Sequence, residues 1–185
     1  MDNALLVLCP EDPHWAPSDN KSLEHLLQSI KFAGKAFNGP MHYLSGDKFL
    51  DYIAFMGCAP DIRLEPGDDN QPFCHIRLIA KTATVEFHGG EKVHVPRCPQ
   101  CRSAVDDWKN KISEWRKSAT EQPWLCGCCQ HQANPWEYNW RRSAGFGRCF
   151  IEISNIYPKE AIPQQALLDT LESRYGVRWQ YFYQY

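Results

Sequence analysis

Two strand-and-helix units of similar pattern open the chain. Residues 4–8 form a short apolar run that is typical of a buried strand. Apolar residues then recur at helical spacing over 23–30, and Gly34 is expected to end that helix. The same order repeats with a strand at 41–44 and a helix over 45–57 that starts at a serine cap and stops at a glycine. We therefore expect two successive strand-and-helix units.

Alternating apolar and polar positions follow and predict antiparallel strands. Residues 74–79 alternate in this way after a turn-rich segment. The apolar runs 84–87 and 93–95 flank the glycine pair at 89–90, which predicts a tight hairpin. The last of these runs leads directly into Cys98.

The second half of the chain returns to helical spacing. Apolar residues at intervals of three, four and three predict a helix over 105–115. A strand is expected at 149–153, a helix over 163–176 that a proline opens and a glycine closes, and a strand at 177–183. If these two strands are parallel neighbours, their connection must be right-handed.

Two pairs of cysteines give the clearest chemical signal. Two residues separate Cys98 from Cys101 and Cys126 from Cys129, and 24 residues lie between the pairs. Two such turns supply the four soft thiolates that tetrahedral Zn²⁺ prefers. The spacer exceeds the usual roughly 15 to 20 residues, and an inserted helix accommodates the difference. Because four sulfur ligands close the coordination sphere, we expect one structural Zn²⁺ per chain.

The second pair leaves its last ligand open. Cys128 directly precedes Cys129, and His131 is close enough in sequence to replace it. We choose Cys129 because two-residue spacing is the commoner arrangement. The alternative to a metal site is a cluster of buried reduced thiols.

These two knuckles resemble those of zinc-ribbon proteins over about a fifth of the chain. The resemblance implies a structural metal held by Cys98, Cys101, Cys126 and Cys129. The remainder has the character of a small bacterial protein and shows no further family resemblance. We predict an α+β fold with mixed or antiparallel sheets, packed helices and an inserted zinc ribbon with four cysteine ligands. The expected parts are 1–96, the ribbon 97–133, and 134–185, the last packed with the first as one unit.

Composition and terminal sequence favour a cytoplasmic protein. The 185 residues are 43% hydrophobic and 23% charged, which is typical of a globular chain. No segment approaches the roughly 18 apolar residues of a membrane span, and the start of the chain does not match a secretion signal. Nine cysteines without such a signal indicate reduced thiols and a metal site.

Positive charge is concentrated around the cysteines. Residues 97–148 carry 9 Lys or Arg against 5 Asp or Glu, a surplus of four, whereas the whole chain has a net charge of −2. Aromatic and basic residues interleave just after the second knuckle: Trp136, Tyr138, Trp140, Arg141, Arg142 and Arg148. Such residues dominate protein interfaces and also hold single-stranded nucleic acid. Alternatively, the aromatic rings fill the junction between ribbon and sheet.

Other candidates are weaker. Cys9 and His14 on one loop suggest a thiol nucleophile, although their spacing has no established catalytic geometry. The glycine-bearing segment 143–147 is expected to be a turn, and the scattered histidines show no ligand spacing. We therefore expect a non-enzymatic zinc-binding module that binds another protein, with nucleic-acid binding as the alternative and a thiol enzyme as a distant third. No small-molecule substrate is inferred.

Overall fold

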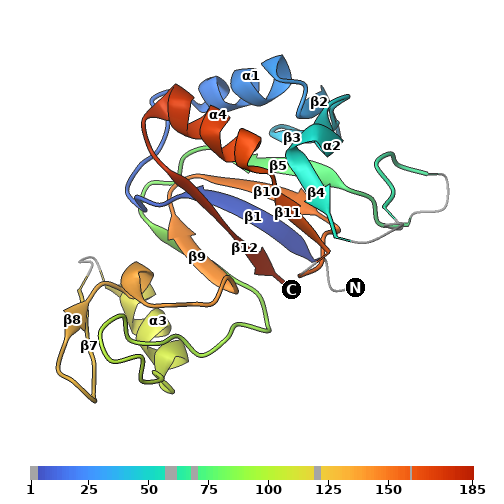
Figure 1. The fold of residues 1–185 in the computed structure, drawn as a ribbon. Coiled ribbons are helices and arrows are strands. Elements are labelled where there is room, and N and C mark those ends of the chain that lie inside the picture. Colours follow the sequence, from blue (N-terminus) through green and yellow to red (C-terminus); the bar gives the residue numbers. More distant parts are fainter. Residues whose placement is uncertain (1–3, 57–61, 68–70, 119–121, 159) are drawn as a thin grey trace.

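A computed structural model of the chain describes residues 4–56, 62–67, 71–118, 122–158 and 160–185. Its centre is a six-stranded antiparallel sheet in the order β12-β1-β10-β5-β3-β2 (Figure 1). In that order the strands are Trp179–Gln184, Leu5–Pro10, Phe150–Ser154, His75–Ile79, His42–Ser45 and Ala33–Ala36. The predicted α+β class is confirmed.

Strand β1, near the start of the chain, pairs with two strands from the last part of the chain. Val7 pairs with Glu152 of β10 on one side and with Phe182 of β12 on the other. Because β1 lies between β10 and β12 and pairs antiparallel with both, these two strands run parallel in one sheet but are not neighbours, so the condition of the prediction is met only in part. Along β1, Leu6 and Leu8 point to one face of the sheet, and the alternate residues point to the other.

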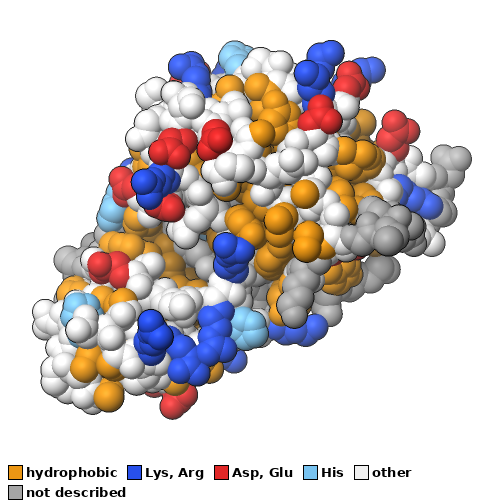
Figure 2. Space-filling model, viewed as in Figure 1, with side chains coloured by type: hydrophobic (Ala, Val, Ile, Leu, Met, Phe, Trp, Pro, Cys, Tyr) orange, Lys and Arg blue, Asp and Glu red, His pale blue; other side chains and the backbone are white. Residues whose placement is uncertain are grey.

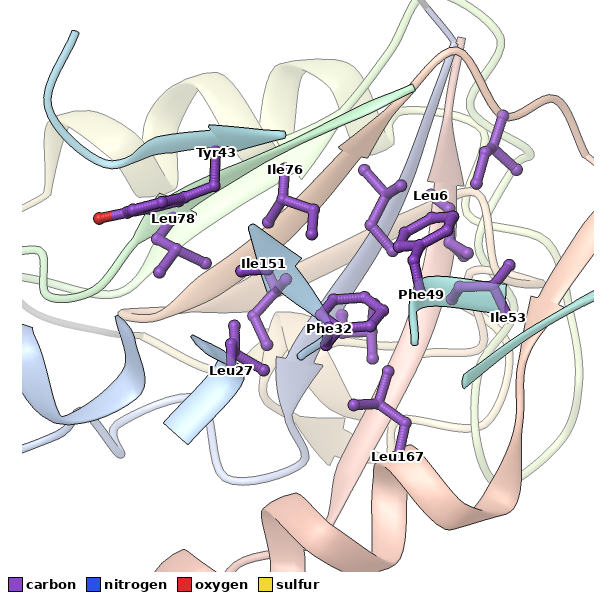
Figure 3. Close-up of a cluster of buried hydrophobic side chains, with 14 of the residues drawn as sticks. Leu6, Leu27, Phe32, Tyr43, Phe49, Ile53, Ile76, Leu78, Ile151 and Leu167 are labelled. Atoms are coloured by element: carbon purple, nitrogen blue, oxygen red, sulfur yellow. The ribbon is translucent and has the colours of Figure 1, made fainter. Parts of the chain in front are cut away.

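Helices cover one face of the main sheet. Figure 1 shows α1 (Asn20–Ser29) and α4 (Gln165–Tyr175) lying over this face. Gly176 ends α4 with a left-handed φ of 69°, as its position in the sequence predicted. The core beneath the helices includes Phe32 and Phe49, whose rings stack with centroids 5.2 Å apart (Figure 3).

A second core lies on the other side of the sheet. Helix α3 (Trp108–Lys117) packs against the two-stranded ladder of β6 (Glu86–Gly89) and β9 (Ala144–Gly147), and the hairpin of β7 (Trp124–Leu125) and β8 (Gln132–Ala133) lies beside it (Figure 1). We call this cluster the ribbon core. Its buried residues are Val85, Phe87, Cys98, Trp108, Ile112, Trp115, Trp124, Cys126, Ala133, Tyr138, Trp140, Ala144 and Phe146.

Several predicted elements differ from those observed. The second helix is only α2 (Phe49–Tyr52), because the next residues form β4 (Ile53–Phe55) and pair with β11 (Ala161–Pro163). The first helix ends at Ser29, and Gly34 lies inside β2. The segment predicted as a turn at 143–147 contains the buried strand β9.

The hairpin expected at the glycine pair 89–90 is also wrong. Strand β6 pairs with β9, more than fifty residues later in the chain, and not with 93–95. A Cβ on Gly90 would lie 2.5 Å from the carbonyl oxygen of Tyr185, so this glycine lets two segments approach closely. Gly90 therefore reflects close packing against Tyr185, the residue that follows β12.

Candidate metal centre and neighbouring surface

The first cysteine turn is held by two backbone hydrogen bonds. The amide of Cys98 donates to the carbonyl of Ser103 over 2.9 Å, and the amide of Arg102 donates to the carbonyl of Cys98 over 3.0 Å. Arg102 takes a left-handed φ of 62°, which turns the chain back on itself.

The second turn repeats this pattern. The amide of Cys126 donates to the carbonyl of His131 over 2.9 Å, and the amide of Gln130 donates to the carbonyl of Cys126 over 3.0 Å. Gln130 has a left-handed φ of 60°. Each left-handed residue lies four positions after the first cysteine of its turn, so Cys101 and Cys129 occupy equivalent positions.

The four thiols meet in one cluster. The Sγ atoms of Cys98, Cys101, Cys126 and Cys129 all lie within 4.8 Å of one another. The Sγ atoms of Cys98 and Cys129 are 3.8 Å apart, and those of Cys101 and Cys126 are 3.7 Å apart. These distances far exceed the roughly 2.05 Å of a disulfide bond. The predicted four-cysteine cluster is confirmed as a group that can hold a metal ion.

Hydrogen bonds favour thiolates at this cluster. Ser103 Oγ lies 3.4 Å from Cys126 Sγ, and this contact, followed by backbone amides of the second turn, lowers the pKa of Cys126 to about 5. A backbone hydrogen bond at His131 also favours the Cys129 thiolate, but burial and the neighbouring thiols prevail and raise the pKa of Cys129 to about 12. Four adjacent thiolates repel one another, so complete ionisation needs a cation.

Cys128 and His131 have exposed side chains and lie outside the cluster. A hydrogen bond with Cys101 is the main reason that the pKa of Cys128 is raised. The hydrogen bond from Ser103 that favours the Cys126 thiolate was not predicted from the sequence. A serine two residues after the last cysteine of a turn is the sequence signal that could have indicated it.

Backbone bonds tie the first turn to the segment that follows the second. The amide of Arg97 donates to the carbonyl of Asn139 over 3.1 Å, and the amide of Asn139 donates back over 2.9 Å. The hydroxyl of Tyr138 donates to the carbonyl of Trp124 over 3.3 Å. The cysteine cluster is therefore part of the ribbon core.

The predicted binding residues divide into two groups. Tyr138 and Trp140 are buried in the ribbon core, so their rings take part in packing. Arg148 is half-buried, and its guanidinium donates to the carbonyls of Thr82 and His14 over 3.0 and 3.3 Å. These three side chains hold the fold together.

Trp136, Arg141 and Arg142 remain at the surface, with Trp136 half-buried and both arginines exposed. All three line a cavity of about 260 Å³ between the ribbon core and β12. We call these three residues and the cavity the binding face. Neither arginine forms an ion pair with any residue in the described part of the chain.

Cys9 lies inside β1 and is fully buried. Burial, reinforced by the neighbouring Cys149, raises the pKa of its thiol, which disfavours the nucleophilic thiolate. The ring of His14 packs edge-on against Trp136, with centroids 5.3 Å apart.

A polar cluster missed by the sequence analysis lies between the main sheet and β6. Nδ1 of His88 is 3.6 Å from one carboxylate oxygen of Glu152, and the guanidinium of Arg77 is 3.5 Å from the other. Burial is the main reason that the pKa of His88 is lowered and that of Glu152 is raised. Beside them, Nε2 of His75 is 3.2 Å from Ser154 Oγ. Strand alternation in β5 and β10 could have placed these residues on one face.

No helix among the described residues has both the length and the apolar character needed to cross a bilayer. Comparison of the chain with protein-family models, with curated proteins and with solved structures gives no match.

Proposed function

We propose that the four-cysteine cluster holds one structural Zn²⁺ and that the protein is a non-enzymatic module that binds another protein through its binding face. The spacing of the sulfur atoms carries the first part of this proposal. A tetrahedron of Zn–S bonds of about 2.3 Å places its sulfurs roughly 3.8 Å apart. The separations across the two turns, 3.8 Å from Cys98 to Cys129 and 3.7 Å from Cys101 to Cys126, match that edge.

A structural role follows from the ligand count. Four protein thiolates leave the ion without an open position for water or substrate, whereas catalytic zinc sites keep one. The ion also supplies the positive charge that four adjacent thiolates need. Iron takes the same tetrahedral sulfur ligands, so the choice between the metals is a matter for measurement.

The identity of the metal is tested by metal analysis, and the choice of ligands is tested by replacing two neighbouring cysteines. We expect metal analysis of the purified chain to give one zinc per protein, and a coloured, iron-containing sample would contradict the zinc assignment. Cys129→Ser should lose most of the metal, because a hydroxyl is a poor replacement for a thiolate. The control, Cys128→Ser, should retain it because Cys128 lies outside the cluster. The opposite result for this pair would show that the second turn uses Cys128.

The binding face supports the interaction role. Trp and Arg anchors commonly cost about 2 kcal/mol or more when truncated in protein interfaces. Trp136, Arg141 and Arg142 are the aromatic and basic residues of the predicted set that are not fully engaged in packing. The ribbon core and its metal would hold them in fixed positions, which reduces the ordering cost of binding.

This role is tested by partner capture from the native cells, with identification of the bound proteins. We expect Arg141→Asn with Arg142→Asn to lose the partner while metal content and folding stay unchanged. Asparagine is preferred to alanine because both positions have left-handed φ values, 51° and 56°. The control with the same charge change is Lys109→Ala with Lys117→Ala, on the exposed surface of α3.

The dependence of binding affinity on salt concentration distinguishes a protein partner from a nucleic acid. Binding to a protein should weaken within roughly tenfold between about 50 and 200 mM salt, whereas a fall of about a thousandfold would indicate nucleic acid. If the arginine variant captures every partner that the wild type captures, the binding face is not the site.

A further inference from the structure

The cavity of the binding face has the size and lining to hold one large side chain. Its volume is about 260 Å³, and its buried lining includes Gly145, Phe146 and Phe182. Trp136 and Tyr181 add partly exposed rings. An apolar cavity of about 150 Å³ is enough for benzene. A phenylalanine or leucine side chain therefore fits here without enlarging the cavity.

The backbone at both arginines and the side chain of Arg142 are held in place before any ligand arrives. The side-chain carbonyl of Asn139 accepts a 2.9 Å hydrogen bond from the amide of Arg141. The guanidinium of Arg142 lies over the ring of Tyr181, 4.3 Å from its centroid, and also donates to the Tyr181 hydroxyl. The amide of Tyr183 donates to the carbonyl of Arg142 over 2.9 Å. The backbone of both arginines and the side chain of Arg142 are thus held by neighbours, while the two charges lack an ion-pair partner among the described residues.

A segment with two further cations runs beside the residues that carry the arginines. Residues 92–97 run beside residues 139–143, because the amide of His94 donates to Ser143 Oγ over 2.9 Å and the amide of Arg97 to the Asn139 carbonyl over 3.1 Å. Lys92 and Arg97 on this segment are exposed, with the ammonium of Lys92 over the ring of Tyr185, 5.2 Å from its centroid, and the guanidinium of Arg97 donating to the carbonyl of Arg102 over 3.0 Å. Figure 2 shows Lys and Arg side chains gathered beside a histidine on this side of the molecule. The face therefore favours a negatively charged ligand.

An acidic peptide fits these observations better than a nucleic acid does. Single-stranded nucleic acid needs a basic groove that follows several phosphates in succession. Here the two cations that line the cavity, Arg141 and Arg142, lie at one partly open cavity and not along a groove, and Glu11 in the same lining disfavours a ligand with many negative charges. A carboxylate matches the planar guanidinium fork, and a neighbouring apolar side chain matches the cavity.

We propose that this cavity binds an acidic segment of the partner protein, with a carboxylate on Arg141 and Arg142 and an adjacent large apolar side chain inside. This proposal rests on the proposed function and specifies the chemistry of the partner. A partner segment of this kind places glutamate or aspartate next to phenylalanine or leucine.

The test is an NMR titration of the metal-loaded full chain with two peptides, acetyl-Gly-Glu-Phe-Glu-Gly-amide and its analogue with glutamine in place of both glutamates. We expect the acidic peptide to shift the indole N–H signal of Trp136 and the side-chain N–H signal of Arg142. The glutamine peptide should bind about tenfold more weakly or worse, because it loses a hydrogen bond between charged groups. Arg141→Asn with Arg142→Asn should weaken the acidic peptide by a similar factor, and Lys109→Ala with Lys117→Ala should not.

Three outcomes overturn the proposal. Equal binding of the two peptides would mean that the face does not recognise carboxylates. Binding of a single-stranded oligouridylate that depends on the two arginines, without binding of either peptide, would assign the face to nucleic acid. If neither peptide binds and neither displaces a natural partner whose capture needs the arginines, the proposed function stands and the acidic segment is wrong.

Discussion

Trp140 lies in the middle of the ribbon core, and its replacement tests whether the ring serves packing or binding. Only 5% of the residue is exposed. Its ring centroid lies 5.2 Å from that of Phe87, 5.5 Å from that of Trp108 and 5.6 Å from that of Phe146. Its indole N–H donates to the buried carbonyl of Pro135 over 2.9 Å.

These contacts set the expected losses of unfolding free energy. Replacement of a buried Trp by Ala typically costs about 3 to 5 kcal/mol. Trp140→Phe keeps an aromatic ring but leaves the Pro135 carbonyl without its donor, which costs about 1 to 3 kcal/mol. We therefore expect losses of about 4 kcal/mol for Trp140→Ala and about 2 kcal/mol for Trp140→Phe. Since whole domains are stable by about 5 to 15 kcal/mol, the alanine variant should be close to unfolding.

The assay is urea unfolding of the metal-loaded protein followed by circular dichroism, with the free energy taken from the midpoint and slope. Partner capture is measured on the same samples. A loss below about 1 kcal/mol in Trp140→Ala, combined with loss of partner, would show that the ring binds and does not pack. The half-buried Trp136 serves as the control, because Trp136→Ala should weaken partner capture at a smaller cost in stability.

Two further predictions concern the contact between the ribbon core and the main sheet. A Cβ on Gly145 would lie 2.2 Å from the buried ring of Phe182, so Gly145→Ala should lower the unfolding free energy by about 1 to 3 kcal/mol in urea titrations. Gly127→Ala, with no atom within 4 Å of the new Cβ, should change it by less than about 0.5 kcal/mol. Burial lowers the pKa of His88 below 6.5, so the folded state binds fewer protons there than the unfolded state does. The contribution of this group to the unfolding free energy is therefore present above pH 6.5 and is lost as the pH falls toward the folded-state pKa. His88→Gln should remove that loss. Unfolding free energies of the two proteins that change in parallel with pH would contradict this prediction.

The sequence predicted those helices and turns that are determined by residues close to one another in the chain. The apolar spacing over 105–115 gave the position of α3, because Trp108, Ile112 and Trp115 lie on one side of a helix. Gly176 indicated the end of α4, since glycine readily takes the left-handed conformation. The two cysteine turns were predictable for the same reason, because each is a short loop whose cysteine spacing is fixed by its own backbone.

Features that depend on distant segments could not be read in this way. Ile53 continues the apolar spacing of a helix, yet β4 forms because β11, about a hundred residues later, provides a strand partner. Nothing in the sequence near β6 identifies β9 as its neighbour. The left-handed backbone at Arg141 and Arg142 was also not predictable, because arginine has no preference for that conformation.

The left-handed arginines connect the two sites physically. Arg97, next to Cys98 of the cysteine cluster, exchanges two backbone hydrogen bonds with Asn139. The side chain of Asn139 in turn holds the amide of Arg141, and the next residue is bonded to β12 of the main sheet. A continuous set of hydrogen bonds thus runs from the cysteine cluster through the binding face to the sheet. A metal at the cluster would therefore help to position two arginines that it does not touch, which links the proposed structural ion to the proposed role in recognition.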